Sequence, residues 1–236
     1  MGLRIFLCPF PGYTKHFFRR VVPDVITGDQ YLSDFFLYRV TVPRLTDTET
    51  IYLAGGQERM ANGKATKNFW RLDLSQRSNR ESFQWEELPW PEGASPRLLP
   101  VMAAQSDGRE TCVFLFSGRD APGHDAKLLA DSWKYSPSKG WSRIADSPRC
   151  LMAGVAVPIG ASSIVALGGD DGENFGQDLR DEHPGFPRDM VFLYDTVTDR
   201  WSQRGELKAN HVTTNAVRWG KHFVIPSGEI RPGVRS

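Results

Sequence analysis

The chain has 236 residues, of which 24% are charged, 40% hydrophobic and 11% aromatic. This composition is typical of a globular protein and excludes a disordered, collagen-like or coiled-coil chain. The 29 basic residues balance 28 acidic ones, so charge does not indicate nucleic acid or a membrane as partner. The three cysteines form no CxxC pair, and we expect neither a disulfide framework nor a cysteine zinc site.

The first segment, residues 1–34, contains PFPGYTKHFFRR and carries no clean signal sequence. No apolar run in the chain approaches the roughly 18 residues that span a bilayer. We expect residues 1–34 not to match a repeat unit, and the compartment stays unassigned.

An apolar strand that ends in a glycine turn recurs four times along the rest of the chain. The four copies are IYLAGG at 51–56, VFLFSG at 113–118, IVALGG at 164–169 and FVIPSG at 223–228. Their spacing of roughly 50 to 60 residues fits the kelch repeat with loop insertions. Each of the first three turns precedes an aromatic strand and then a strand led by Trp85, Trp141 or Trp201. The repeat predicts four-stranded antiparallel blades, with these Trp side chains packed between blades.

Counting strands predicts an all-β, kelch-type β-propeller with about three and a half blades of an expected six. The predicted blades are residues 35–90, 96–147 and 150–207, with a half blade at 211–236. Three and a half blades cannot close a ring, so we expect the chain to be a fragment of a longer propeller.

The fourth glycine turn continues as SGEIRPGVRS, which places Glu229, Arg231 and Arg235 around Pro232-Gly233. Pro followed by Gly favours a type II turn, which would fold Glu229 back toward Arg235. A carboxylate beside a guanidinium offers a proton acceptor and an anion clamp. An exposed salt bridge without function is the alternative interpretation of the same residues.

Together with IYLAGGQ, LFSGRD, ALGGDDG and YDTVTDRWS, the run GEIRPGVR resembles the cyclically permuted mutarotase group of kelch proteins. That group contains the sialic acid mutarotases, also named N-acetylneuraminate epimerases. The resemblance implies that Glu229 is the general base and that Arg235 is its partner at the substrate. It also implies that Arg97, in SPRLLP, and Arg231 help to bind the substrate, although a Pro-Arg pair before a strand can equally be structural. Arg149, in SPRCLM, is expected at the place equivalent to Arg97 one blade later.

The resemblance implies an isomerase that interconverts the α and β anomers of N-acetylneuraminate, a small sugar acid, without metal or organic cofactor. The insertion at residues 170–189 is expected to act as a lid rather than as a metal site. The alternative is a non-catalytic propeller that binds a protein or glycan partner through its loops.

Overall fold

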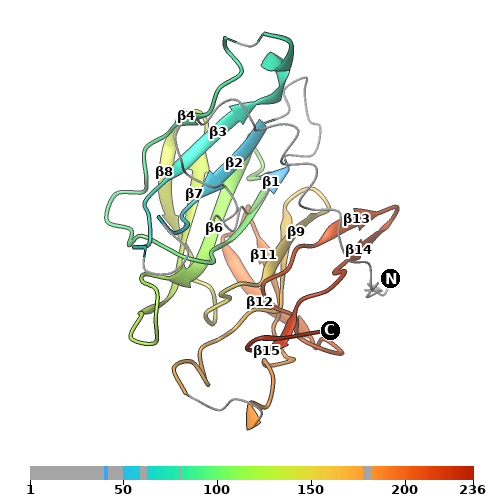
Figure 1. Cartoon of the computed structure of the whole chain (residues 1–236). Helices are drawn as coiled ribbons and strands as arrows, with labels where there is room; N and C mark the ends of the chain where they lie inside the picture. The colour runs from blue at the N-terminus through green and yellow to red at the C-terminus, as the bar shows by residue number, and fades with distance from the viewer. Residues whose placement is uncertain (1–39, 42–49, 59–62, 80, 178–181) are drawn as a thin grey trace.

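Three four-stranded antiparallel sheets follow one another along the chain in the computed structural model (Figure 1). The structure describes residues 40–41, 50–58, 63–79, 81–177 and 182–236, so the segment 1–34 lies outside the described residues. Among the described residues there is no α-helix, and the 3-10 helix Leu74–Ser78 is short. The predicted all-β class is therefore confirmed.

In each sheet, every strand pairs with the next strand along the chain. Sheet 1 contains β1 (Val40–Thr41), β2 (Thr50–Ala54), β3 (Phe69–Asp73) and β4 (Glu86–Glu87). Sheet 2 contains β5 (Val101–Ser106), β6 (Thr111–Arg119), β7 (Leu128–Ser136) and β8 (Gly140–Ile144). Sheet 3 contains β9 (Val155–Ile159), β10 (Ser163–Leu167), β11 (Val191–Asp195) and β12 (Arg200–Gly205). Two hairpins follow, β13 (Val217–Trp219) with β14 (His222–Val224), and β15 (Glu229–Arg231) with β16 (Val234–Arg235).

The sheets pack face to face, which explains why their second strands are continuous apolar runs. β6 is buried from Cys112 to Gly118, and β10 is buried from Ile164 to Leu167. Alternate side chains of β6 enter two different cores: Phe114 packs toward sheet 3, and Leu115 packs toward sheet 1. Because both faces are covered, the alternation of polar and apolar residues that marks a half-exposed strand is lost.

Two of the three repeated tryptophans join neighbouring sheets, as their spacing predicts. Trp141 of β8 donates its indole N–H to the Pro89 carbonyl at 2.7 Å and packs against Phe69 of sheet 1. Trp201 of β12 donates to the Ala145 carbonyl at 3.0 Å and packs against Phe116 of sheet 2. Each indole therefore packs its partly buried ring between two sheets while its N–H keeps a partner.

An irregularity in pairing near the end of β6 brings its backbone close to the segment that precedes β5. Gly118 has φ +111°, and a Cβ atom built on it would lie 2.6 Å from the Leu98 carbonyl oxygen. Backbone atoms cannot move aside as a flexible side chain can, so only glycine fits there.

Gly118→Ala is therefore expected to lower the free energy of unfolding by at least about 3 kcal/mol, which combines backbone strain with overpacking. Gly160→Ala is the matched control, because Gly160 has φ +59° but open space around its Cβ position. The control should lose only about 1–2 kcal/mol. Urea unfolding of both variants measures the difference, and equal losses would contradict the proposed close approach.

The two cysteines in the described part of the chain are structural. Cys112 and Cys150 are free and buried, and burial raises the pKa of the Cys112 thiol to about 12. A thiol that stays protonated in this way is a poor nucleophile and a poor metal ligand. In the same described residues, no helix is long and apolar enough to cross a membrane.

Candidate functional site

The loop after the fourth glycine turn folds into the β15–β16 hairpin, in which Glu229 pairs with Arg235 across the strands. Pro232 and Gly233 form the turn, and Gly233 has φ +72°. Arg235 Nη2 donates to Glu229 Oε1 at 3.3 Å, and the Gly233 N–H approaches Glu229 Oε2 at 3.4 Å. The side chain of Glu229 is 23% exposed and that of Arg235 is 57% exposed. The turn thus brings carboxylate and guanidinium together as the sequence predicts, and their roles stay a prediction.

The backbone of Glu229 is held on one side by Val212. Their N–H and carbonyl groups exchange two hydrogen bonds, each 2.9 Å long. His211, which precedes Val212, is buried, and its Nε2 lies 2.8 Å from the Ser236 hydroxyl. The Ser236 N–H also donates to the Gly228 carbonyl at 3.2 Å. These contacts fasten both ends of the hairpin, so the carboxylate is carried by a fixed backbone.

The same bridge recurs in the two preceding sheets, and it identifies the residues equivalent to Glu229. In each case the residue after the glycine turn forms a β-bridge with a residue whose successor in the chain has a positive φ. The bridges are Leu98 with Arg119, Met152 with Asp170 and Val212 with Glu229, followed by positive φ at Leu99, Ala153 and Thr213. Arg119, Asp170 and Glu229 therefore occupy equivalent positions at one end of successive sheets.

Arg119 is a candidate anion ligand that the sequence analysis did not identify. Its side chain lies 5.5 Å from the Phe175 ring centre, and its Nε is buried without a hydrogen-bond partner in the structure. Its hydrogen bond from Nη1 to the Gly123 carbonyl is long, at 3.5 Å. A guanidinium with unused donors at this position can bind a carboxylate. The signal in the sequence was present, because Arg119 follows SG as Glu229 does.

Asp170 is the second residue that the sequence analysis did not assign to the site. Burial raises the pKa of its carboxyl, an effect that the neighbouring Asp171 adds to and that His183 and Arg119 oppose. A carboxyl group with a raised pKa holds its proton at higher pH than an exposed Asp. Asp170 and Arg119 therefore place an acid and a cation at the end of the sheets that also carries Glu229.

Arg97 lies in the segment that precedes β5, and its side chain is 0% exposed. Its Nη2 donates to Asp131 Oδ2 at 2.6 Å, and its Nη1 donates to the Ser117 and Asp131 carbonyls at 3.1 and 3.3 Å. Burial lowers the pKa of Arg97, while Asp131 opposes this shift. This geometry favours the structural interpretation of the Pro-Arg pair over substrate binding. Arg231, the other predicted ligand, is half-buried on β15 and pairs with Val234 across the hairpin.

The expected equivalence of Arg149 and Arg97 is wrong. Leu151 takes that place, since it precedes the bridging Met152 as Arg97 precedes Leu98. The chain between the SPR motif and the bridge is two residues longer in sheet 3, and this shifts Arg149 away from the core. Arg149 instead forms ion pairs with Asp189 at 2.6 Å and with Asp171 at 3.5 Å. It therefore ties together the two ends of the insertion 170–189.

The described parts of that insertion reach the β15–β16 hairpin. A Cβ atom on Gly185 would lie 3.3 Å from the Ile230 carbonyl oxygen, and the loop runs beside β15 in Figure 1. His183 Nδ1 accepts the Gly185 N–H at 3.0 Å, which shapes the loop where it meets the hairpin. Across the described residues, no group of three or more His, Cys, Asp or Glu side chains is placed to hold a metal ion. The position of the loop is compatible with the expected lid.

Comparison with known proteins bears on the fold. No protein-family model and no curated protein sequence matches the chain. The solved structure of YjhT matches it with a TM-score of 0.60 at 18% sequence identity. The match covers 85% of this chain and 60% of the YjhT chain, so the present chain spans about 60% of that length. The chain has a partial β-propeller fold. At this identity the likeness supports the fold, and sheets 1, 2 and 3 are its blades.

Proposed function

We propose that this propeller is an isomerase of the mutarotase type that interconverts the anomers of a sugar acid, with N-acetylneuraminate as the substrate. The observation that carries the proposal is the Glu229–Arg235 pair on a fixed hairpin, at the sheet end that also bears Arg119 and Asp170. The resemblance of GEIRPGVR to the permuted mutarotases supports the same assignment. The likeness to YjhT supports the fold on which it rests.

Opening the sugar ring needs two proton transfers, one from the anomeric hydroxyl and one to the ring oxygen. Glu229 removes the proton from the anomeric hydroxyl, the bond between the anomeric carbon and the ring oxygen breaks, and the ring oxygen takes a proton. The open keto form rotates about one bond and closes onto its other face by the reverse steps. Asp170 is suited to hold the proton for the ring oxygen, because its pKa is raised by burial. A positioned acid and base typically contribute 10²–10⁴-fold each.

The carboxylate of a sugar acid requires a cation near the anomeric carbon. Arg235 and Arg119 both have guanidinium donors at this end of the sheets, whereas the Nη donors of Arg97 are occupied. Arg matches a carboxylate through two parallel hydrogen bonds. The number of cations therefore favours an acidic sugar over a neutral one.

The experiment that tests the proposal is one-dimensional proton NMR of freshly dissolved N-acetylneuraminate. We expect the chain to accelerate the approach of the two anomers to equilibrium above the rate in buffer. Glucose, which has no carboxylate, is the matched substrate and should show little acceleration. An N-acetylneuraminate rate equal to that in buffer would contradict the proposal and favour a propeller that only binds.

Arg119→Gln is expected to weaken N-acetylneuraminate binding by about 10- to 100-fold, since a hydrogen bond to a charged group contributes about 1.5–3 kcal/mol. Arg204→Gln is the control, because Arg204 is exposed on β12 and carries the same charge. Titration calorimetry measures both dissociation constants. A dissociation constant for Arg119→Gln that matches the control would remove Arg119 from the site.

A further inference from the structure

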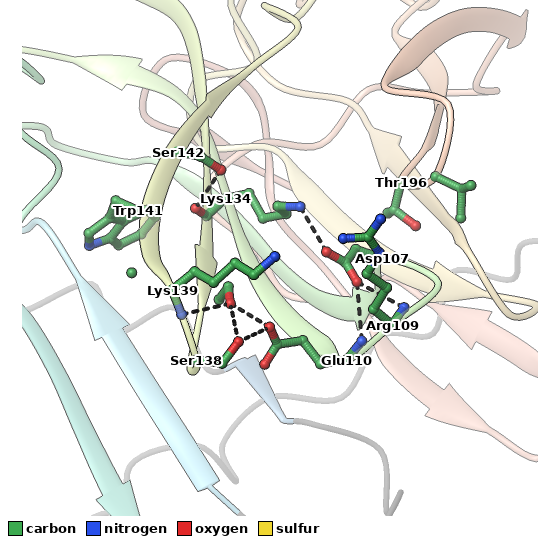
Figure 2. A pocket seen from close by; sticks show the side chains of 12 residues that line it. Asp107, Arg109, Glu110, Lys134, Ser138, Lys139, Trp141, Ser142 and Thr196 are labelled. Carbon is green, nitrogen blue, oxygen red and sulfur yellow. Dashed lines mark hydrogen bonds and ion pairs between the residues drawn. The ribbon is translucent and has the colours of Figure 1, made fainter.

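A pocket lies at the opposite end of sheet 2 from the glycine turns (Figure 2). It has a volume of about 650 Å³, within the range that holds small organic ligands. The turns β5–β6, β7–β8 and β11–β12 line it, so it joins sheet 2 to sheet 3. β6 spans nine residues between the pocket and Arg119, or about 26 Å along the strand. The pocket is therefore separate from the candidate site described above.

Three cationic side chains meet in this pocket. Figure 2 shows the ammonium groups of Lys134 and Lys139 and the guanidinium of Arg109 directed toward the same space. They come from different elements, since Arg109 follows β5, Lys134 lies on β7 and Lys139 precedes β8. Lys134 is paired with Asp107 at 2.8 Å. Arg109 and Lys139 have no ion pair with any described residue, which leaves two positive charges without a partner.

The two carboxylates of the pocket are already bound. Asp107 accepts hydrogen bonds from Lys134 Nζ and from the backbone N–H groups of Arg109 and Glu110. Burial alone would raise its pKa, but these three donors lower it. Glu110 accepts the hydroxyl groups of Ser136 and Ser138, each at 2.5 Å. Asp107 therefore spends both oxygens on protein donors, whereas Glu110 uses only Oε1. Three cations against two carboxylates leave the pocket with a net positive charge.

The walls of the pocket are fixed by contacts between the sheets. Thr196 Oγ1 donates to the backbone carbonyls of Ser106 and Ser162, which ties the β11–β12 turn to sheet 2. Val197 packs on the β5–β6 turn, where its Cγ2 would lie 3.2 Å from a Cβ on Gly108. Ligand binding thus needs little ordering of the backbone, which lowers its entropic cost.

We propose that this pocket binds a small organic phosphate, with the phosphate group between Arg109, Lys134 and Lys139. A phosphate monoester carries about −1.5 to −2 charges at neutral pH, which matches the two unpartnered cations. Its three outer oxygens can accept from a guanidinium fork and two ammonium groups at once. A carboxylate has one charge and two oxygens, so it would leave one cation unpaired. The organic part fits the remaining volume beside Val197 and Trp141.

The test is titration calorimetry of the full chain with ribose 5-phosphate, inorganic phosphate and acetate at constant ionic strength. We expect saturable binding of ribose 5-phosphate and weaker binding of inorganic phosphate. The variant Arg109→Gln with Lys139→Gln should weaken ribose 5-phosphate binding at least tenfold. The control, Arg204→Gln with Lys208→Gln, removes the same charge from exposed residues outside the pocket and should change it less than twofold.

A second substitution, Glu110→Gln, should change the affinity for ribose 5-phosphate in the opposite direction. It removes a negative charge near the phosphate while it keeps an acceptor for Ser136 and Ser138, so binding should become tighter. Thermal melts confirm that each variant is folded. The proposal is overturned by the absence of saturable ribose 5-phosphate binding, by acetate binding as tightly, or by equal weakening in the two double variants.

Discussion

Replacing Arg97 by alanine is expected to lower the free energy of unfolding by about 3–5 kcal/mol, because it leaves the carboxylate of Asp131 without its buried counterion. Arg97 is fully buried and donates from both Nη atoms. Asp131 would keep only the Trp133 indole N–H at 2.6 Å, and its Oδ1 is already buried without a partner. The loss therefore combines a removed ion pair with a carboxylate that is only 19% exposed.

The chain offers a matched control in the exposed pair of Arg143 and Asp146, whose N to O distance is 2.5 Å. Arg143→Ala should cost no more than about 1 kcal/mol, since solvent screens such pairs. Arg97→Met combined with Asp131→Asn should recover part of the loss, because no buried charge remains. Urea unfolding measures all four proteins. A loss for Arg97→Ala as small as that for Arg143→Ala would contradict the structural role of Arg97.

The same pair predicts a dependence of stability on pH. Burial alone would raise the pKa of Asp131, but Arg97 and Trp133 lower it below the ordinary Asp value. A lowered carboxyl pKa stabilises the fold above about pH 4, and the gain is lost as pH falls through the lowered pKa. When the pH is lowered from neutral to acid, the free energy of unfolding of the Arg97→Ala variant should therefore fall less than that of the parent chain. Equal acid sensitivity of both proteins would contradict this assignment.

Glu229→Gln is expected to reduce the rate of N-acetylneuraminate anomer exchange by 10²–10⁴-fold, because the amide cannot accept the proton of the anomeric hydroxyl. The substitution keeps the size of the side chain and an oxygen that can accept from Arg235. Substrate binding should therefore change far less than kcat. Steady-state exchange rates over a range of substrate concentration separate the two effects.

Glu206→Gln is the control for this substitution, since Glu206 is an exposed glutamate just after β12. Its rate should equal that of the parent chain. A Glu229→Gln variant that keeps the parent rate would remove Glu229 from the reaction. If kcat and the affinity for substrate fall by the same factor, the result would instead indicate that Glu229 holds the hairpin in shape.

The sequence predicts the sheets well because their signals are local. A glycine turn after an apolar run and a tryptophan two strands later repeat at nearly constant spacing, and Trp141 and Trp201 join neighbouring sheets as this pattern requires. The Glu229–Arg235 pair is local in the same way, since Pro232 and Gly233 determine it within one hairpin.

The environment of Arg97 could not be predicted in this way. Its partner Asp131 lies 34 residues away, and the pair forms only when the segment before β5 packs against β7. Arg149 looks equivalent by motif, but two extra residues before the bridge move it to the surface and leave Leu151 in the core. Arg119 was missed because, although it follows SG as Glu229 does, only its pairing with Leu98 in the fold establishes that the two positions are equivalent.

The central claim is that the sheet end bearing Arg119, Asp170 and Glu229 binds the sugar acid. Titration of the isotope-labelled chain with N-acetylneuraminate, followed by backbone amide chemical shifts, tests this most directly. We predict saturable shifts in residues 118–120, 168–171 and 228–236, and none in residues 107–110 or 138–142. Shifts confined to the latter residues, or no saturable shift at all, would contradict the claim.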